Sequence, residues 1–512
     1  MDYLLGIDVG TTGTKCLLID PSGRIAARAN HEYDLHTPKP GWSEQDPADW
    51  WQATREGLRE ILARPEIQAD QIKGVGLSGQ MHGSVFLDKD GKVIRPALLW
   101  NDQRTAAQCQ WITDKLGAET VVAETRNPVL TGFTAPKIVW LQQQEPASYE
   151  RVKKILLPKD YVRYLLTGEF ATEVSDASGT SLLNIERRQW SGKMLSGLGL
   201  DREMLPKVFE SPVASAAVCE TGAKETGLRR GTPVVGGGGD QAAGAVGNGI
   251  VVSGLISATT GTSGVVFASM EEPRTDPELR THTFCHAVPN KWHVMGVMLS
   301  AGGSLRWYRD AIATEEKAEA KRRGVDPYEV ICESAEKAPV GCEGLIFLPY
   351  LTGERSPYPD ANARGVFFGL TLRSDRSHLA RAVLEGVAYG LRDQFEILKE
   401  MGLKVEQVRA SGGGARSKLW RQIQADVLNC RLTTINVDEG PAFGAALLAG
   451  VGAGVYPTVE EACARTIEDR ERTEPTAARS SLYERYYCVY RKLYASLRAD
   501  FAAASGIAGS EP

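Results

Sequence analysis

The residues best suited to chemistry lie in one stretch near the middle of the chain, where an acid follows a run of glycines. Gly236–Gly239 are four consecutive glycines, Asp240 comes directly after them, and small residues that can form a helix follow. Glycine lets the backbone turn tightly and lets a ligand approach closely. A carboxylate held at a helix start beside open space can accept a proton, so this stretch predicts a catalytic base. The alternative is that Asp240 only caps the helix.

Two Thr/Gly turns, one in each half of the chain, are of a kind that binds phosphate. The first lies within Asp8–Lys15 (DVGTTGTK) and the second within Thr260–Ser263 (TGTS). In a tight hairpin, backbone N–H groups and hydroxyls point into one concavity, which suits phosphate oxygens. Lys15 adds positive charge, and Asp8 stands at a strand end, where it could hold Mg²⁺ through water. A plain hairpin turn is the alternative for each.

A second group of polar residues is typical of a pocket for a small polar substrate. A loop between two glycines offers an amide, a thioether and an imidazole, from Gln80, Met81 and His82. Trp100 could stack on a carbon skeleton, and Asn101 and Asp102 could form hydrogen bonds with hydroxyl groups. Because Met81 and Trp100 are equally common in apolar cores, they support a substrate pocket only together with the other residues.

A third glycine-rich turn stands between a predicted strand and a predicted helix. Ala410–Ser417 contains Gly412, Gly413 and Gly414, and apolar residues at helical spacing follow over residues 419–427. Such a turn brings the backbone close to a flat ligand, for which adenosine is a candidate. The spacing is not that of a dinucleotide-binding fingerprint, and a tight strand–helix connection is the alternative.

The elements that must position these residues alternate between strands and helices. Residues 3–7, 14–19 and 72–77 are predicted strands. Asp46-Pro47 predicts a helix start, with Asp as the N-cap residue and Pro as the first helical residue. Near the C-terminus, the capping box Ser481–Glu484 predicts the start of the last helix. Mixed strands and helices indicate an α/β protein.

The strand–turn–strand pattern of the N-terminus recurs past the midpoint of the chain. Residues 255–267 resemble residues 7–17, although similar Thr/Gly turns also arise by chance. A duplicated unit predicts two related domains that face a common ligand, with a boundary near residues 248–256. We therefore expect one domain over residues 1–248 and another over residues 249–512.

The composition limits the class of protein. With 512 residues, of which 42% are hydrophobic and 24% charged, a globular protein of more than one domain is expected. A formal net charge of -5 gives no reason to expect nucleic acid or an anionic membrane as a partner. No apolar run approaches the ~20 residues of a membrane span. The nine cysteines include no C-x-x-C pair, so free thiols in the cytoplasm are expected rather than disulfides or zinc.

Several longer motifs occur together along the chain. Two signature stretches are Thr134–Leu141 (TAPKIVWL) and Gly365–Gly386, and shorter ones are Trp42–Pro47, Leu156–Tyr161, Phe347–Leu351 and Gly353–Arg355. Through them the chain resembles the FGGY carbohydrate kinases of the actin/hexokinase-like ATPase superfamily, over about residues 3–450. The resemblance implies an α/β fold of two actin/hexokinase-like (ribonuclease H-like) ATPase domains with a cleft between them.

The resemblance also implies an activity. It implies transfer of the γ-phosphoryl group of ATP to a sugar hydroxyl in the presence of Mg²⁺, and the motifs favour the C5 hydroxyl of D-xylulose. L-ribulose, L-xylulose, gluconate and glycerol remain alternative substrates within the family. An actin-like ATPase that is not a kinase is the alternative of another class, and it would have no need for an acid beside a sugar pocket.

Carried onto this chain, the resemblance makes Asp240 the base, Met81 and His82 substrate contacts, and Asp8 part of the Mg²⁺–ATP end. The expected nucleotide contacts are Thr11, Thr12, Lys15, Thr260, Gly261 and Thr262 at the phosphates, and Gly413, Gly414, Ala415 and Lys418 at the nucleoside. Gln241 stands where Asn is expected, which leaves the base in place but changes a neighbouring amide. Homodimers are common in the family, which suggests a homodimer here.

Overall fold

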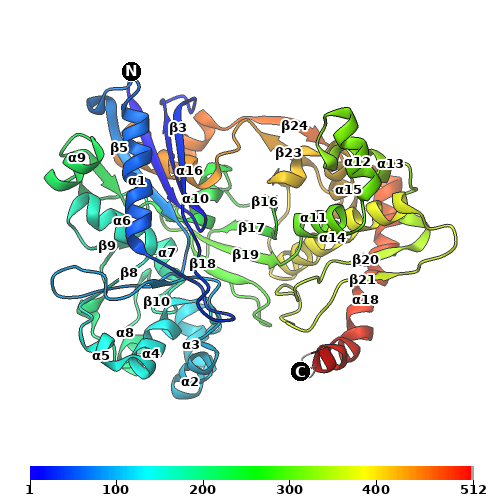
Figure 1. The fold of residues 1–512 in the computed structure, drawn as a ribbon, viewed down its shortest axis with the longest axis horizontal. Helices are drawn as coiled ribbons and strands as arrows, with labels where there is room; N and C mark the ends of the chain where they lie inside the picture. The colour runs from blue at the N-terminus through cyan, green and yellow to red at the C-terminus, as the bar shows by residue number, and fades with distance from the viewer. Residues whose placement is uncertain (509–512) are drawn as a thin grey trace.

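Two seven-stranded sheets form the body of the molecule, one in each half of the chain (Figure 1). The computed structural model describes residues 1–508. The first sheet runs in the order β13-β14-β5-β1-β2-β3, and β15 also pairs with β5. Its strands are β1 (Tyr3–Val9), β2 (Gly13–Ile19), β3 (Ile25–Glu32), β5 (Ile72–Gly79), β13 (Ala214–Ala217), β14 (Pro233–Val235) and β15 (Gly238–Gly239). The strands predicted near the N-terminus are therefore confirmed.

Helices cover both faces of the first sheet. α1 (Pro47–Leu62) begins as predicted, because the Asp46 carboxylate at the N-cap accepts the Ala48 N–H. α1 packs on β2 and β3, whereas α16 (Gly440–Gly452) packs on β1 and β5. Alternate residues of β2 enter two different cores, with Leu18 on the α1 side and Leu17 on the α16 side. Burial on both faces explains why β1 and β5 contain almost no polar residues before their last few positions.

The second sheet repeats the topology of the first. Its order is β18-β19-β17-β16-β22-β23-β24. Its strands are β16 (Leu255–Thr260), β17 (Gly264–Met270), β18 (His282–Cys285), β19 (Trp292–Met298), β22 (Gln407–Ser411), β23 (Leu432–Ile435) and β24 (Asp469–Thr473). β1 pairs antiparallel with β2 and parallel with β5, and β16 pairs in the same way with β17 and β22. The predicted duplication of the strand–turn–strand unit is confirmed.

Two helices at the centre of the molecule, α10 (Asp240–Gly247) and α16, pack closely against each other (Figure 1). A Cβ atom on Gly444 would lie 1.8 Å from the Ala243 carbonyl oxygen, and one on Gly247 would lie 2.1 Å from the Gly440 carbonyl oxygen. Glycine is therefore required where the helices touch. α16 follows β23 of the second sheet yet covers the first sheet, and the chain then returns to the second sheet for β24. The boundary at residues 248 and 249 stays a prediction, and residues 509–512 of the second predicted domain lie outside the described residues.

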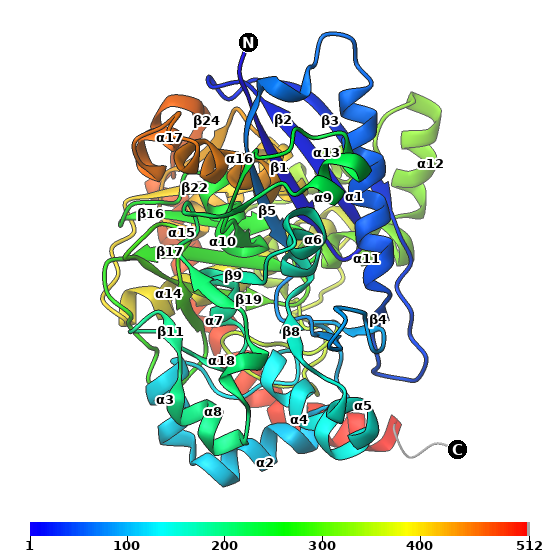
Figure 2. The same cartoon turned by 90° about the vertical axis from the view of Figure 1, so that its left-hand side faces the viewer.

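The remaining helices form a lobe on the first half and a layer on the second. The lobe, at the bottom of Figure 2, contains α2 (Ala106–Leu116), α3 (Ala118–Thr125), α4 (Thr134–Gln144), α5 (Pro146–Glu150) and α8 (Gly192–Leu198). Helices of the second half are α11 (Gly302–Ala311), α12 (Thr314–Arg323), α13 (Pro327–Glu336), α14 (Arg376–Glu400), α15 (Lys418–Leu428) and α18 (Ala477–Ala508). None of the helices within residues 1–508 combines the length and apolar character that a membrane crossing needs.

The last helix, α18, starts earlier than the sequence predicts. The capping box Ser481–Glu484 is not its start, because the helix begins at Ala477. The Ser480 N–H donates to the Thr476 carbonyl, so helical hydrogen bonding already spans the residues before Ser481. Thr476 and Ala477 offered no stronger start signal in the sequence, and that prediction is wrong by one helical turn.

Candidate active site

Asp240 stands at the start of α10, directly after a strand that ends against β5. Gly238 and Gly239 pair with Ser78 and Gly79 of β5, and α10 begins with Asp240 as its first helical residue. Its N-cap residue is Gly239. The Oδ1 atom of Asp240 accepts the N–H of its neighbour Gln241 at 2.7 Å. Asp240 is therefore not the capping residue, and its carboxylate remains partly exposed at the helix start.

The electrostatic surroundings of Asp240 suit a base that takes up a proton near neutral pH. Burial raises the pKa of Asp240 to about 7, and the nearby Asp8 carboxylate adds to this rise. Burial also raises the pKa of Asp8 to about 6, although the nearby Ser78 hydroxyl and the Lys15 charge act to lower it. A general base is most effective when its pKa lies near the working pH. The two acids thus form a pair in which Asp240 holds the higher pKa.

A cavity of about 270 Å³ opens beside Asp240, bordered by α10, by the start of α16 and by strands of the second sheet. It is lined by Asp240 and Gln241 of α10, by Ser257 and Thr259 of β16, by Ser411 and Gly412 after β22, and by Asp438, Gly440 and Pro441 at the start of α16. The N-termini of α10 and α16 both border it, and such ends favour anions. The cavity therefore combines an acid, several hydroxyls and two helix N-termini, as a site for a phosphorylated ligand would.

The two predicted phosphate hairpins differ in what their side chains contact. In the first, the Thr11 hydroxyl accepts the Trp100 indole N–H at 3.0 Å, Thr12 is exposed, and the Lys15 ammonium donates to Glu439 at 2.9 Å. In the second, Thr260 is buried and accepts from Gln424 at 3.5 Å, and Thr262 accepts from Arg306 at 3.0 Å. The Gly261 carbonyl accepts the Gly302 N–H. Their contacts with phosphate stay predictions.

The Gly79–Gly83 loop brings Met81 next to the glycines before Asp240. A Cβ atom on Gly239 would lie 2.9 Å from Cγ of Met81. His82 adopts a left-handed backbone conformation with φ of 69°, and its Nδ1 donates to the Gly179 carbonyl oxygen at 2.7 Å, since a carbonyl can only accept. Burial lowers the pKa of His82 to about 3. His82 is therefore a neutral imidazole beside Met81. Oε1 of Gln80, at the start of the same loop, accepts a hydrogen bond from the Thr11 hydroxyl at 3.3 Å.

Lys137 holds the loop that carries His82, a role that spacing alone did not indicate. The Lys137 ammonium donates to the His82 carbonyl at 2.8 Å and to the Gly132 carbonyl at 2.6 Å. The Thr134 hydroxyl also donates to the His82 carbonyl, at 3.0 Å. Burial lowers the pKa of Lys137 to about 7. Both residues lie in the first signature stretch, so the motif itself was the only signal that could have found them.

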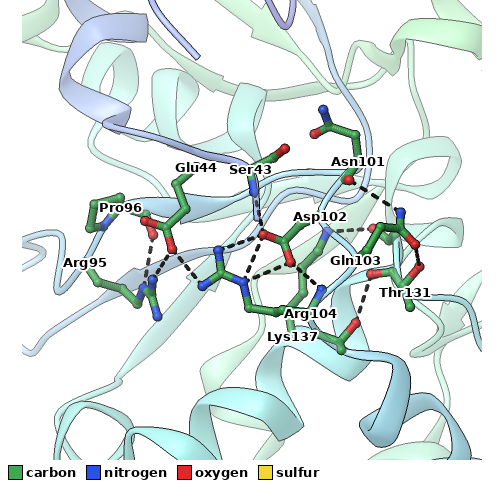
Figure 3. A network of polar contacts seen from close by, with 12 residues as sticks. Ser43, Glu44, Arg95, Pro96, Asn101, Asp102, Gln103, Arg104, Thr131 and Lys137 are labelled. Atoms are coloured by element: carbon green, nitrogen blue, oxygen red, sulfur yellow. Dashed lines mark hydrogen bonds and ion pairs between the residues drawn. The ribbon is translucent and has the colours of Figure 1, made fainter. Parts of the chain in front are cut away.

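Figure 3 shows that Asp102 lies in a dense polar network rather than in open space. Its Oδ2 accepts the Ser43 N–H and the Arg104 guanidinium, each at 2.7 Å, and its Oδ1 accepts the Arg104 N–H at 3.0 Å. Arg104 also contacts Glu44 at 2.7 Å. Both Asp102 oxygens are thus engaged by protein groups, whereas Trp100 is 41% exposed and Oδ1 of Asn101 is buried without a partner in residues 1–508. Trp100 and Asn101 are accordingly freer than Asp102 to meet a ligand.

The third glycine-rich turn forms a short 3-10 helix, Gly413–Arg416, after β22. A Cβ atom on Gly414 would lie 2.5 Å from Cγ2 of Thr260, so glycine is required for this contact with the second hairpin. Ala415 is buried in the core of the second half, whereas Gly413 and Lys418 are exposed. The turn therefore supports the second hairpin, and the nucleoside contacts of Gly413, Gly414, Ala415 and Lys418 stay predictions.

Comparisons with known proteins agree over nearly the whole chain. Models of the N-terminal and C-terminal domains of the FGGY family of carbohydrate kinases match residues 3–247 and 256–453. The xylulose kinase of Escherichia coli (strain K12) is 40% identical over 494 residues, which are 96% of this chain and 99% of that protein. A crystal structure of a xyloylose kinase from Brucella ovis, 39% identical, has a TM-score of 0.89 and covers 97% of this chain and 99% of its own. A gluconate kinase from Lactobacillus acidophilus, 26% identical, reaches a TM-score of 0.91 over 98% of this chain and 99% of its own.

These similarities confirm the predicted fold of two actin/hexokinase-like domains. They also make ATP and a carbohydrate the expected pair of substrates, because the matching family consists of carbohydrate kinases. The site described above agrees, since an acid at the start of α10 borders a cavity that is suited to phosphate. The chain belongs to the FGGY family of carbohydrate kinases.

Proposed function

We propose that this chain transfers the γ-phosphoryl group of ATP to the C5 hydroxyl of D-xylulose, giving D-xylulose 5-phosphate and ADP. The observation that carries the proposal is Asp240, an acid whose pKa burial raises to about 7 and which borders the cavity between α10, the start of α16 and the second sheet. Met81 lies against the glycine that precedes Asp240, and His82 comes next along the chain, so these two side chains are the proposed contacts of the sugar. The substrate is taken from the xylulose kinases that resemble the chain along its length.

In this mechanism Asp240 accepts the proton of the sugar hydroxyl as its oxygen attacks the γ-phosphorus. Phosphoryl transfer depends mainly on in-line placement and on neutralising the phosphate charge, with little covalent work by the protein. The two helix N-termini that border the cavity supply fixed positive partial charge for the phosphates. Asp240 starts deprotonated above pH 7 and ends protonated, and ADP leaves without that proton.

Asp8 is the residue proposed to hold Mg²⁺. The fit rests on its Oδ1 atom, which is buried and has no hydrogen-bond partner in the described part of the chain. A carboxylate oxygen or a water molecule held by it is a ligand that Mg²⁺ prefers. When bound, the ion would neutralise charge on the phosphate oxygens. Before the ion binds, the Asp8 charge beside Asp240 helps to raise the pKa of the base.

The choice of sugar is the part of the proposal most open to test, because a gluconate kinase shares the fold. ADP release should be measured with ATP and D-xylulose, L-ribulose, L-xylulose, gluconate or glycerol, each at several concentrations. We expect the highest kcat/KM with D-xylulose, and a ³¹P NMR signal coupled to the C5 protons of the product. A higher kcat/KM with another substrate would replace the substrate assignment. ATP hydrolysis that no sugar stimulates would remove the kinase assignment altogether.

We also propose a cytoplasmic homodimer. Support for the compartment comes from the cysteines, since all nine are free thiols, which fits a reducing environment. Support for the dimer comes from family resemblance alone. Sedimentation velocity at micromolar concentration would give a mass near twice 55.6 kDa for a dimer, and a mass near 55.6 kDa would exclude it.

A further inference from the structure

Five charged residues lie fully buried behind the glycines that precede Asp240. They are Lys159, Asp160 and Arg163 on α6 (Pro158–Thr167), Glu173 at the end of β9 (Ala171–Glu173), and Asp176 on α7 (Val174–Ser178), and we call them the buried charge cluster. The Lys159 ammonium lies 2.8 Å from Asp160, 3.0 Å from Asp176 and 3.6 Å from Glu173. Removing charges from water is costly, and an apolar core would avoid that cost. Because burying these charges costs free energy, we expect the buried charge cluster to have a function.

Glu173 uses its carboxylate to fix the hydroxyl of Ser175. Oε1 of Glu173 accepts the Ser175 hydroxyl at 2.9 Å, and Oε2 accepts the Ser175 N–H at 2.7 Å. A serine hydroxyl has one proton and two lone pairs. Because Glu173 takes the proton, the lone pairs of Ser175 are left for another donor. That donor is the N–H of Gly239, which lies 3.1 Å from Oγ of Ser175.

The same cluster reaches two further peptides of the glycine run. Glu173 accepts the Ser211 hydroxyl at 2.7 Å, and the Ser211 carbonyl accepts the Gly237 N–H at 2.8 Å. Arg163 donates to the Gly236 carbonyl. On the other side, the glycines press against β5, where a Cβ atom on Gly237 would lie 1.9 Å from the Leu77 carbonyl oxygen. The run is thus held from both sides up to the residue before Asp240.

We propose that Ser175 and Glu173 are positioning residues that set the place of the Asp240 carboxylate through the Gly239 peptide. The proposal rests on the proposed role of Asp240 as the base. Asp240 follows Gly239 directly in the chain, so a shift of that peptide moves the carboxylate relative to the sugar hydroxyl. A misplacement of about 1 Å at a reacting group can cost on the order of 10²-fold in rate.

A double-mutant cycle tests this coupling with kcat for D-xylulose and ATP. The four enzymes are the unchanged chain, Ser175→Ala, Asp240→Asn and the double variant. We expect Ser175→Ala to lower kcat about 10- to 100-fold, with KM for the sugar changed less than threefold. In the Asp240→Asn background the same change should cost less than twofold, because the group it positions is gone. An equal loss in both backgrounds, or no loss in the first, would overturn the proposal.

The Asp240→Asn variant by itself tests the proposed function, separately from the positioning proposal. If Asp240→Asn alone keeps near-normal turnover, Asp240 is not the base, whatever Ser175→Ala does. If Asp240→Asn leaves no measurable turnover, Asp240→Glu serves as the background, since it keeps an acid in a displaced position. The expected cost of Ser175→Ala there is again below its cost in the unchanged enzyme, and an equal cost would overturn the proposal.

Ser178→Ala is the matched control, because Ser178 is a buried serine on the same short helix. Its hydroxyl donates to the Val174 carbonyl at 2.6 Å and accepts the Cys285 N–H at 3.0 Å, and within residues 1–508 it forms no hydrogen bond with the glycine run. We expect Ser178→Ala to lower the melting temperature as much as Ser175→Ala while kcat stays within twofold. Equal kcat losses would mean that α7 is merely loosened, which would overturn the proposal. Should Ser175→Ala not fold, Ser175→Cys, with its weaker acceptor, takes its place and should show the same pattern.

Discussion

The two sheets have the same three paired backbone positions at their strand ends, yet they fill them with different chemistry. In the first sheet Asp8 pairs with Lys15 across the hairpin and with Ser78 on the parallel side. In the second sheet Thr259 pairs with Val265 and Ser411 in the corresponding places. The first half thus carries a charged pair and the second half carries neutral groups, with the Thr259 and Ser411 hydroxyls 2.8 Å apart.

The helices that follow the sheets repeat this difference. α10 starts with Asp240, whose pKa burial raises to about 7. α16 starts after Asp438 and Glu439, of which Asp438 is exposed and Glu439 is paired with Lys15 and Arg28. Duplication therefore supplies a common frame, and the two copies then specialise. In the proposed mechanism the first half handles the proton and the metal, and the second half offers hydroxyls and backbone to the phosphates.

The largest expected effect comes from replacing, one at a time, the two acids that border the cavity. Asp240→Asn should lower kcat by ~10²–10⁴-fold, the usual contribution of a positioned base, whereas Asp438→Asn should cost less than tenfold. Steady-state ADP release with D-xylulose measures both. Comparable losses for the two variants would mean that the halves do not divide the chemistry in this way.

A second buried acid provides the control for that comparison. Asp393 on α14 also has its pKa raised to about 7 by burial, and its Oδ1 accepts the Tyr487 hydroxyl at 2.7 Å in the core of the second half. Asp393→Asn preserves that acceptor and should leave kcat within twofold. A large loss there would show that neutralising any buried acid harms turnover.

Much of this duplicated architecture can be predicted from the sequence, because the motifs that indicate it are local. The hairpins, their duplication and the start of α1 each depend on residues within a few positions of one another. The Ser175–Gly239 hydrogen bond joins residues 64 apart, and the return of α16 to the first sheet depends on packing, so neither has a sequence signature. Asp102 is an intermediate case, because its partner Arg104 is only two residues away and an ion pair could have been predicted.

The next largest effect concerns the corresponding positions Asp8 and Thr259. Asp8→Asn removes the carboxylate proposed to hold Mg²⁺ and should lower kcat about 10- to 100-fold, with a raised Mg²⁺ requirement. Thr259→Val removes one hydroxyl of a neutral pair and should cost about three- to fivefold, the value of one ordinary hydrogen bond. Kinetics over a range of Mg²⁺ concentrations distinguish the two. If Thr259→Val changed the Mg²⁺ dependence and Asp8→Asn did not, the roles of the halves would be reversed.

A smaller effect is expected from pH, because the base must be deprotonated to act. With the pKa of Asp240 at about 7, kcat/KM should fall as the pH drops below 7, by up to about tenfold per pH unit. Asp8 contributes to that raised pKa, so Asp8→Asn should move the acid limb to lower pH. Thr259→Val changes only the neutral hydroxyl pair of the second sheet and should leave the acid side of the pH–rate profile unchanged. An unmoved limb in Asp8→Asn would show that the two acids do not interact.

The smallest expected effect is on stability, and its sign follows from the same raised pKa. Burial raises the pKa of Asp240 to about 7 in the folded chain, against an ordinary aspartate pKa of 3.8. The folded state therefore binds the proton more tightly, and the stability linked to this group is lost as the pH rises through 7. Asp240→Asn removes that loss, so its melting temperature at pH 8 should exceed that of the unchanged enzyme by about 1 °C for each kcal/mol relieved, because the unfolding entropy grows with chain length. The difference should shrink toward pH 5, and Thr259→Val should show no such dependence. Calorimetry at the two pH values checks both, and a destabilised Asp240→Asn at pH 8 would mean that the charged acid is compensated in the free enzyme.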